Sequence, residues 1–268
     1  MQNIVKTALF VFALQASSVS AHEFWVEPVN SKSANMRVGQ MMVGENLPYL
    51  DRIVLSARHF GPDGEEALAG REGDLPALAV DLSAPGLHVI TLETKPAYIV
   101  FDTLAEFGDY LGYEGLQNVL TRHEARALPS TEIAEEYWRY ARALVQSGPA
   151  LAGDTDAPVG LRYELVAVTS PFWSTDGQVE LKLTWEGAAE AGAQIAVFHK
   201  GPGADGAVSR ALLQSDENGK VTAKVNEPGV YVFNAVHMLD GTGPGSVVWQ
   251  SHWASLSFEI GRDGHVDQ

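Results

Sequence analysis

Short apolar segments recur along this chain, and Gly, Pro, Asn or Asp separates each from the next. Short segments bounded by such turn-forming residues are typical of β-strands. Five lie in the first part of the chain, at 36–43, 52–60, 75–81, 86–94 and 97–101. Seven more follow, at 161–169, 179–186, 194–200, 209–215, 220–225, 229–237 and 251–260. Each strand has to bury a face against a second sheet, so this pattern predicts β-sandwiches.

The middle of the chain has a helical periodicity instead. Apolar residues spaced for one face predict a helix over 103–114, and 116–126 is a second candidate. The strongest helical pattern covers 130–147, where apolar residues repeat at i, i+4, i+7, i+8 and i+11. Ser130 can cap that segment, and a Gly-Pro pair follows its last residue.

These patterns predict two β-sandwich domains with a small helical insertion between them. The N-terminal sandwich covers 22–101, and the helical segment 102–150 is expected to pack on it. Residues 151–158, rich in Gly, Asp and Pro, indicate a linker. The C-terminal sandwich, immunoglobulin-like or prealbumin-like, covers 159–261, and the tail 262–268 is expected to be disordered.

The first 21 residues have the three zones of a secretory signal peptide. Lys6 is the first charge, an apolar run covers 7–16, and small residues end at Ala21. The apolar run is half of the roughly 20 residues that a membrane-spanning helix needs. We therefore expect cleavage after Ala21, a location in the periplasm and no stable insertion into the membrane.

Cleavage at that point would make His22 the first residue of the mature chain. An N-terminal histidine can chelate a metal ion through its α-amine and its ring Nδ1. Both nitrogens are available as neutral donors near neutral pH, because their ordinary pKa values lie close to it. The alternative is that His22 is only the residue where the cut falls.

Composition and motifs narrow the chemistry further. The chain has no cysteine, which excludes disulfides, thiolate metal sites and cysteine nucleophiles. A formal charge of −16 argues against nucleic-acid partners, because phosphate binding needs clustered Lys and Arg. The sequence also lacks a nucleophile elbow, a phosphate loop, a dinucleotide fingerprint and a His-Glu-x-x-His motif. We expect a binding protein without an organic cofactor rather than an enzyme.

Two histidines in the last two predicted strands form the best candidate for an assembled site. If those strands pair antiparallel with His237 opposite His252, Tyr231 falls opposite Phe258 and the apolar residues share one face. Both imidazoles would then lie near the end of the strands. The alternative is one buried, hydrogen-bonded histidine and one surface histidine.

The other histidines are weaker candidates. No two histidines lie three or four residues apart, so none forms a ready-made pair on a helix. His59 is a further candidate ligand, although it can equally be a strand-face residue like His88. We expect His123 and His265 to be solvated.

Several segments carry a resemblance as a set. They include Ala21-His-Glu-Phe-Trp-Val-Glu-Pro28, Phe107-Gly-Asp-Tyr-Leu111, Glu136-Tyr-Trp-Arg-Tyr140, Ala235-Val-His-Met238 and Trp249-Gln-Ser-His-Trp253. Together they resemble the NikM-like periplasmic family, catalogued as domain-of-unknown-function family 4198, over essentially the whole chain after residue 21. The resemblance implies a secreted protein of two β-sandwich parts with a link to nickel or cobalt uptake. Within it, His22 matches the mature start and His237 a late strand motif, whereas the pattern requires no histidine at His252.

The leading hypothesis is a periplasmic protein that binds a divalent transition-metal ion, nickel, cobalt, copper or zinc. Its candidate ligands are His22, His237, His252 and His59. Its expected partners are the metal ion and an envelope transporter or outer-membrane receptor. A second hypothesis is a non-catalytic immunoglobulin-like module that binds proteins or glycans through its loops. A third is a copper oxidase, since an N-terminal histidine paired with another histidine also occurs in oxidative polysaccharide enzymes.

Overall fold

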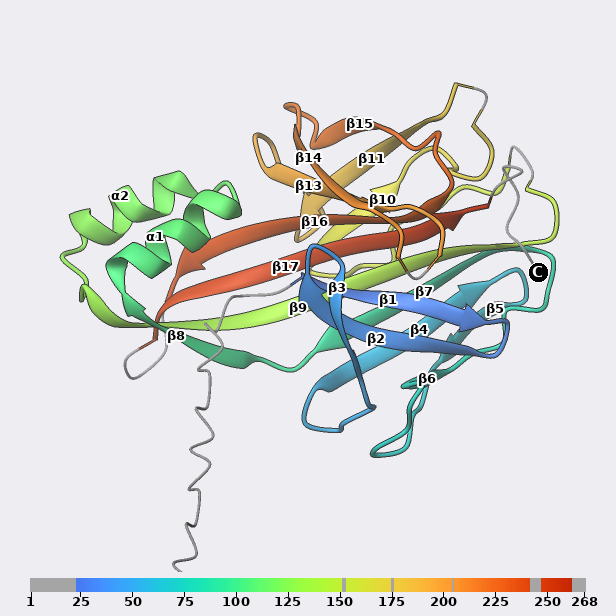
Figure 1. The fold of residues 1–268 in the computed structure, drawn as a ribbon, viewed down its shortest axis with the longest axis horizontal. Coiled ribbons are helices and arrows are strands. Elements are labelled where there is room, and N and C mark those ends of the chain that lie inside the picture. The colour runs from blue at the N-terminus through green and yellow to red at the C-terminus, as the bar shows by residue number, and fades with distance from the viewer. Residues whose placement is uncertain (1–22, 151–152, 175, 204, 242–246, 262–268) are drawn as a thin grey trace, which may run out of the picture.

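The computed structural model of this protein describes residues 23–150, 153–174, 176–203, 205–241 and 247–261 (Figure 1). The predicted signal peptide, His22, His265 and the predicted disordered tail lie outside these residues. Within the described ranges the chain is mainly β, as predicted, with two α-helices. The sequence therefore predicted the fold class correctly.

The described elements follow one another closely along the chain. In order they are β1 (Glu23–Asn30), β2 (Ser33–Gln40), β3 (Val43–Leu47), β4 (Val54–Gly61), β5 (Gly64–Ala67), β6 (Leu78–Ala79), β7 (Gly86–Thr94), β8 (Ala97–Thr103), α1 (Leu104–Tyr113), α2 (Gln117–Ala125), β9 (Thr131–Ser147), β10 (Tyr163–Ala167), β11 (Gln178–Trp185), β12 (Ala188–Ala189), β13 (Gln194–Lys200), β14 (Val208–Gln214), β15 (Lys220–Lys224), β16 (Gly229–Asp240) and β17 (Val247–Ile260).

A nine-stranded sheet forms the centre of the protein. Its strand order is β14-β13-β16-β17-β9-β7-β4-β5, and β8 pairs with β9 beside β7. Strands β9 and β17 run parallel, and their neighbours pair antiparallel. This sheet contains strands from both sides of the predicted linker 151–158. The division into two domains stays a prediction.

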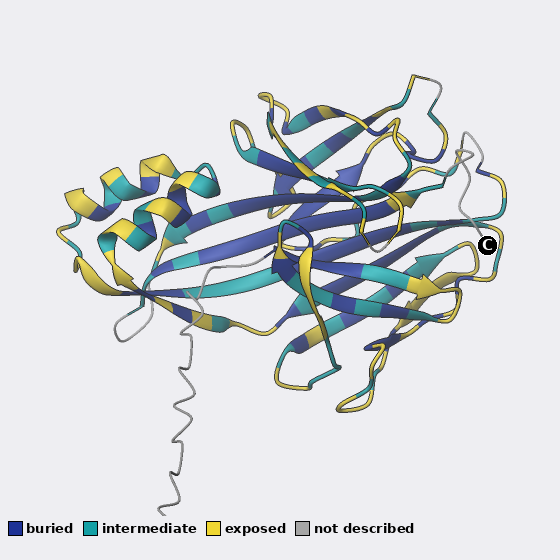
Figure 2. Cartoon of the chain, viewed as in Figure 1, coloured by how far each residue is buried: buried dark blue, intermediate teal, exposed yellow. Residues whose placement is uncertain are grey.

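Two smaller sheets cover opposite faces of the central sheet (Figure 1). One contains β1, β2, β3 and β6, and the other contains β10, β11, β12 and β15. Along β9, Tyr140 and Leu144 pack in the core under the β10–β11 sheet, whereas Ala141 and Ala143 pack in the core under the β1–β2 sheet. Successive side chains point to opposite faces of a strand, so the central strands are buried on both sides, as Figure 2 shows.

The predicted helix over 130–147 was wrong, because this segment is the strand β9. It lies between β17 on one side and β7 and β8 on the other, with both faces covered. A strand buried on both faces needs apolar residues at odd and even positions, and this obscures the two-residue alternation. Strand pairing and packing outweighed the helical spacing of Ile133, Tyr137, Tyr140 and Leu144.

The two predicted helices before β9 are confirmed as α1 and α2. Thr103 caps α1, because its hydroxyl accepts a hydrogen bond from the backbone N–H of Glu106 at 3.2 Å. Phe107 and Leu111 of α1 pack with Trp249 and Trp253 of β17 in one apolar core. The helices therefore cover the end of the central sheet where β8, β9 and β17 meet (Figure 1).

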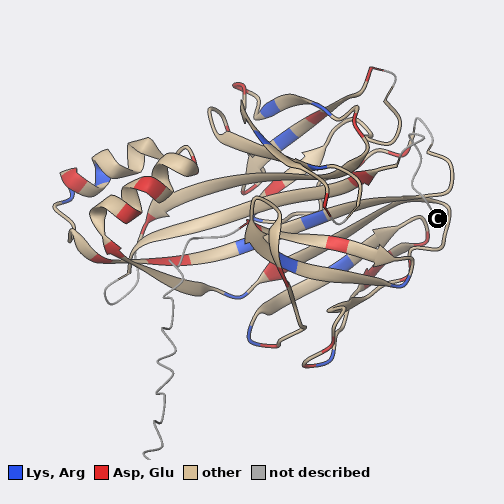
Figure 3. Cartoon of the chain, in the orientation of Figure 1, with Lys and Arg blue, Asp and Glu red and all other residues tan. Residues whose placement is uncertain are grey.

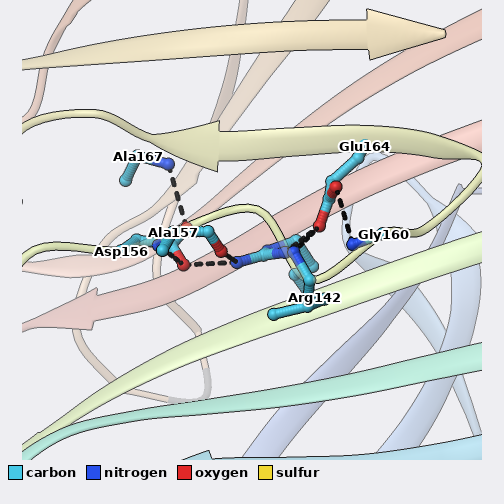
Figure 4. Close-up of polar contacts among 7 residues, drawn as sticks. Arg142, Asp156, Ala157, Gly160, Glu164 and Ala167 are labelled. Atoms are coloured by element: carbon cyan, nitrogen blue, oxygen red, sulfur yellow. Dashed lines mark hydrogen bonds and ion pairs between the residues drawn. The ribbon is translucent and has the colours of Figure 1, made fainter. Parts of the chain in front are cut away.

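A buried arginine ties the segment before β10 to the central sheet (Figure 4). Arg142 of β9 is fully buried and donates to the carboxylates of Asp156 and Glu164 and to the carbonyl of Ala157, the last at 2.9 Å. Asp156 also accepts the backbone N–H of Ala167 at 3.0 Å. Each charge in this cluster has a partner, as a buried ion pair requires. We assign the cluster a structural role.

Candidate functional site

The predicted register of the last two strands is confirmed. Strands β16 and β17 pair antiparallel with His237 opposite His252 and Tyr231 opposite Phe258. Tyr231 and Phe258 point into the core under the β10–β11 sheet. Because residues two apart along a strand share a face, both histidines point to that side as well. We call His237 and His252 the open pair.

A tight hairpin brings two further residues to His237. The turn Glu186-Gly187 joins β11 to β12, with φ angles of 49° and 80°, and Trp185 pairs with Ala188 across it. Two positive φ angles in a two-residue turn match the twist of the flanking strands and favour glycine. Trp185, at the end of β11, stacks on His237 with ring centroids 4.3 Å apart and planes at 14°. The carboxylate of Glu190, just after β12, contacts a ring nitrogen of the same imidazole.

The two nitrogens of His237 have different surroundings. Its Nδ1 lies 2.7 Å from a carboxylate oxygen of Glu190, so in the neutral ring Nδ1–H donates to that oxygen. This tautomer leaves Nε2 with a free lone pair. Nε2 is buried and has no hydrogen-bond partner among the described residues. His237 is therefore oriented by one nitrogen and open at the other.

His252, on β17, likewise has one contacted ring nitrogen and one unpartnered ring nitrogen. The residue is fully buried, its Nδ1 lies 3.1 Å from the hydroxyl of Tyr140, and its ring stacks on Trp138 at 4.8 Å. Its Nε2 is also buried without a partner in the described part of the chain. Burial, and then the nearby positive charge of Arg162, lower the pKa of His252 to about 3. The imidazole is therefore neutral near pH 7.

Aromatic side chains enclose the open pair. The Trp185 ring also lies 4.7 Å from His252, and the Tyr163 ring lies 5.8 Å from His237. The hydroxyl of Tyr163 is a third buried polar atom without a partner among the described residues. Buried polar atoms in native proteins are almost always hydrogen-bonded to protein or water, or bound to an ion. With two unpartnered nitrogens beside these aromatic rings, the open pair is our candidate ligand site.

The structure places His59, another predicted ligand, in a different pair. On β4 its Nε2 lies 2.8 Å from Nδ1 of His88, and its Nδ1 lies 2.9 Å from a carboxylate oxygen of Glu66. Nε2 of His88 donates to the carbonyl of Ala84 at 2.7 Å. Each ring nitrogen of these two histidines thus has a partner. We call His59 and His88 the closed pair.

The two pairs are far apart on the central sheet. His252 aligns with Trp138 of β9, whereas His88 aligns with Val145 of the same strand. These positions are seven residues apart, or about 23 Å along the strand. His59 therefore cannot join the open pair as a third ligand.

His22 lies outside the described residues, but its neighbour Glu23 begins β1. Glu23 accepts a hydrogen bond from the hydroxyl of Tyr113 at 3.2 Å, and the adjacent Glu114 contacts the side chain of Asn234 at 3.5 Å. Asn234 and His237 are three residues apart on β16, so they point to opposite faces of the central sheet. Glu23 therefore lies across the sheet from the open pair, and a ligand role for His22 stays a prediction.

Two residues of the site, Glu190 and Trp185, were not predicted. Both depend on the β11–β12 hairpin, for which the Glu186-Gly187 turn was the available signal.

His123 was expected to be solvated, but it is buried. Its Nε2 lies 2.9 Å from the Pro129 carbonyl, and its Nδ1 accepts from the Trp249 indole at 3.0 Å. Packing of α2 against β17 explains that correction.

The donor set of the open pair is small. Within the described ranges, no group of three or more His, Cys, Asp or Glu side chains is placed to hold a metal ion. The open pair offers two imidazole nitrogens, and any further ligand would have to come from elsewhere.

None of the helices in the described part of the chain is long and apolar enough to cross a membrane.

Comparisons with known proteins identify a family. The family model described as "Domain of unknown function (DUF4198)" matches residues 19–239, which include His237. No curated protein matches the chain. A similar solved structure is titled "Crystal structure of tetra-tandem repeat in extending region of large adhesion protein", with 11% identity and a TM-score of 0.19. That match covers 88% of this chain and 49% of the other, so this chain spans about half the length of that structure.

Proposed function

The chain belongs to the family described as "Domain of unknown function (DUF4198)", and within that family we propose that it is an exported metal-binding protein. In this proposal it lies in the periplasm and binds a divalent transition-metal ion, nickel, cobalt, copper or zinc, for uptake or handling. It is a binding protein rather than an enzyme. The open pair holds the ion.

The observation that carries this proposal is the state of the two Nε2 atoms. Both belong to histidines that are paired in register on adjacent strands, and both are buried without a partner among the described residues. A neutral imidazole nitrogen with a free lone pair is the commonest metal ligand in proteins. A metal ion bound to both Nε2 atoms would give each of them a partner and remove the cost of leaving them unpaired.

Glu190 adds independent support. A histidine that binds a metal almost always donates its other ring N–H to a carboxylate, carbonyl or water, which fixes the ring and makes the ligating nitrogen more basic. The contact of 2.7 Å between Nδ1 of His237 and Glu190 has that form. Glu190 is therefore proposed to orient His237 rather than to bind the ion itself.

Charge and family resemblance favour a role in metal supply. The chain carries a formal charge of −16, and Figure 3 shows Asp and Glu spread over helices, strands and loops. A negative surface raises the local concentration of cations. The resemblance to the NikM-like family suggests that an envelope transporter or an outer-membrane receptor receives the ion from this protein or passes the ion to it.

Isothermal titration calorimetry with Ni²⁺, Co²⁺, Cu²⁺ and Zn²⁺ tests the proposal, using protein purified after export. We expect at least one ion to bind with 1:1 stoichiometry and a Kd below about 10 μM, or better than about −6.8 kcal/mol. His237→Gln should weaken that binding, and His59→Gln, the matched control, should not. Binding weaker than about 100 μM for every ion, or binding that His237→Gln leaves unchanged, would contradict the proposal.

A further inference from the structure

Strand β8 is a free edge of the central sheet (Figure 1). It pairs with β9 on one side, and among the described residues no strand pairs with its other side. Edge strands are commonly protected by being short or by a Lys, a Pro or a bulge that keeps another strand from pairing with them. β8 has seven residues, Ala-Tyr-Ile-Val-Phe-Asp-Thr, without Lys or Pro. Its free backbone N–H and C=O groups can therefore accept a further strand.

The side chains of β8 divide between the two faces of the sheet. Ile99 and Phe101 are buried in the apolar core that α1 covers. Tyr98 and Val100 alternate with them, so they point to the opposite face, where they are 64% and 49% exposed. Side chains of a strand added to β8 would lie directly beside these two and cover them.

This edge lies close to the open pair and on the same face of the sheet. Tyr98 pairs with Glu136 of β9, and Glu136 pairs with Gln250 of β17. Gln250 is two residues before His252, so the two share a face and are about 7 Å apart along the strand. β8 and β17 are two strand spacings apart, or roughly 10 Å. A partner held at β8 would therefore lie near the site where the ion is proposed to bind.

The charge along this edge is negative. The Glu136 carboxylate accepts hydrogen bonds from two neutral groups, the Tyr98 hydroxyl at 2.7 Å and the Gln250 amide at 3.0 Å. Asp102 is exposed, and its backbone N–H donates to the Glu106 carboxylate at 3.1 Å. None of these three carboxylates has an ion-pair partner in the described part of the chain, and β8, β16 and β17 contain no Lys or Arg. The edge therefore favours a partner with positive side chains.

We infer that β8 is the docking edge for an extended segment of a partner protein, in which Lys or Arg flanks β-branched residues. The segment pairs with β8 as an added strand, and its apolar side chains pack beside Tyr98 and Val100. Its basic side chains meet the carboxylates of Asp102, Glu106 and Glu136. A second copy of this chain fits less well, because two β8 edges would bring like charges together. The inference deepens the proposed function and rests on it only for the view that this partner exchanges the ion.

Hydrogen exchange measured by mass spectrometry tests the inference on the full exported chain. The probe is the terminally blocked peptide Lys-Thr-Val-Thr-Val-Thr-Lys, its counterpart with Glu at both ends is the control, and a chelator keeps the protein free of metal. At saturation we expect the Lys-ended peptide to slow exchange in β8 at least about tenfold and to leave β14, the other seven-residue edge strand, unchanged. Fluorescence anisotropy should give a Kd below about 1 mM for this peptide.

Two matched variants test whether β8 itself holds the peptide. Val100→Lys adds a positive charge to the exposed face of β8 and should weaken binding of the Lys-ended peptide at least about tenfold. Leu212→Lys makes the same change on β14, where Leu212 is 52% exposed, and should alter the affinity less than about twofold. Both positions are exposed, and circular dichroism checks that both variants fold.

The possible outcomes separate this inference from the proposed function. Unchanged exchange in β8, equal protection by the Glu-ended peptide, or equal losses in the two variants would each overturn the docking edge. A dimer of the metal-free chain that Val100→Lys abolishes, detected by analytical ultracentrifugation, would overturn it in favour of a second copy. None of these results bears on metal binding, which the calorimetry decides. Protection of β8 in a protein that binds no ion would support the docking edge and contradict the proposed function.

Discussion

Two histidine pairs lie on the central sheet, and they differ in what their nitrogens contact. In the closed pair, hydrogen bonds run from Glu66 through His59 and His88 to the carbonyl of Ala84. In the open pair, each ring has one partner, and each Nε2 has none among the described residues. The same residue type thus serves as a hydrogen-bonded structural group in one place and as a candidate metal ligand in the other.

The direction of the hydrogen bonds explains why the closed pair is a poor metal site. His88 donates from Nε2 to a carbonyl, so its Nδ1 must accept the N–H of His59. The remaining nitrogen of His59 faces Glu66, and a proton is needed between them. A Cβ at Gly61 would lie 2.9 Å from Nε2 of His59, so backbone packs directly against the rings. No lone pair is left for an ion.

The largest expected difference between the pairs is in metal affinity. His252→Gln removes one of two ligands, and we expect it to weaken binding of the preferred ion at least about 100-fold, or about 2.7 kcal/mol. His88→Gln, the matched change in the closed pair, should leave the affinity within about threefold. Competition with a chelating dye measures both variants. An equal loss in the two variants would remove the distinction between the pairs.

The carboxylate that contacts each pair gives a second comparison. Glu190→Gln weakens the acceptor for Nδ1–H of His237, and loss of such a partner lowers metal affinity about 10- to 100-fold. Glu66→Gln makes the same change beside His59 and should not alter affinity. The same dye competition applies. If Glu66→Gln had the larger effect, the assignment of the two pairs would be reversed.

When stability is measured without metal, we expect a substitution in the closed pair to have a larger effect than one in the open pair. His88→Leu leaves the half-buried carbonyl of Ala84 and the buried N–H of His59 unpaired, so we expect a loss of about 1–3 kcal/mol in the free energy of unfolding. His237→Leu removes an unpartnered nitrogen and leaves Glu190, which solvent reaches, so the change should stay within about 1 kcal/mol. Urea denaturation with a chelator present measures both. A larger loss for His237→Leu would show that the open pair mainly stabilises the fold.

The smallest expected effect concerns pH. Burial, together with the adjacent His59, lowers the pKa of His88, although Asp81 and Asp63 and the bond to Ala84 oppose this. Below about pH 6.5 the unfolded chain therefore binds a proton at His88 that the folded chain resists, and the free energy of unfolding falls as the pH falls. The slope from one group is at most about 1.4 kcal/mol per pH unit. Denaturation between pH 5 and 7 should show a shallower slope for His88→Gln than for the wild type, and an unchanged slope would contradict this.

The sequence predicted the open pair because a strong pattern fixes its register. Shifting β16 against β17 by one residue would move Tyr231 and Phe258 out of the core, so the alternation of apolar residues sets His237 opposite His252. The closed pair lacks such a signal. His59 lies opposite Ile90 rather than His88, and the contact forms between residues that are diagonal neighbours on β4 and β7.

Two other features depend on contacts that local patterns do not encode. β9 resembles a helix because both its faces are buried, and only its neighbours in the sheet show that it is a strand. Glu190 reaches His237 because a two-residue turn folds β12 back along β11. The backbone of the site was therefore more predictable than the residues that orient its ligands.

Anomalous diffraction from crystals loaded with the ion that binds most tightly tests the central claim most directly. We predict one strong peak at about 2 Å from Nε2 of His237 and from Nε2 of His252, the usual length of a metal–imidazole bond. No peak is expected beside His59 and His88. A peak at the closed pair, or a loaded protein without a peak at the open pair, would contradict the account.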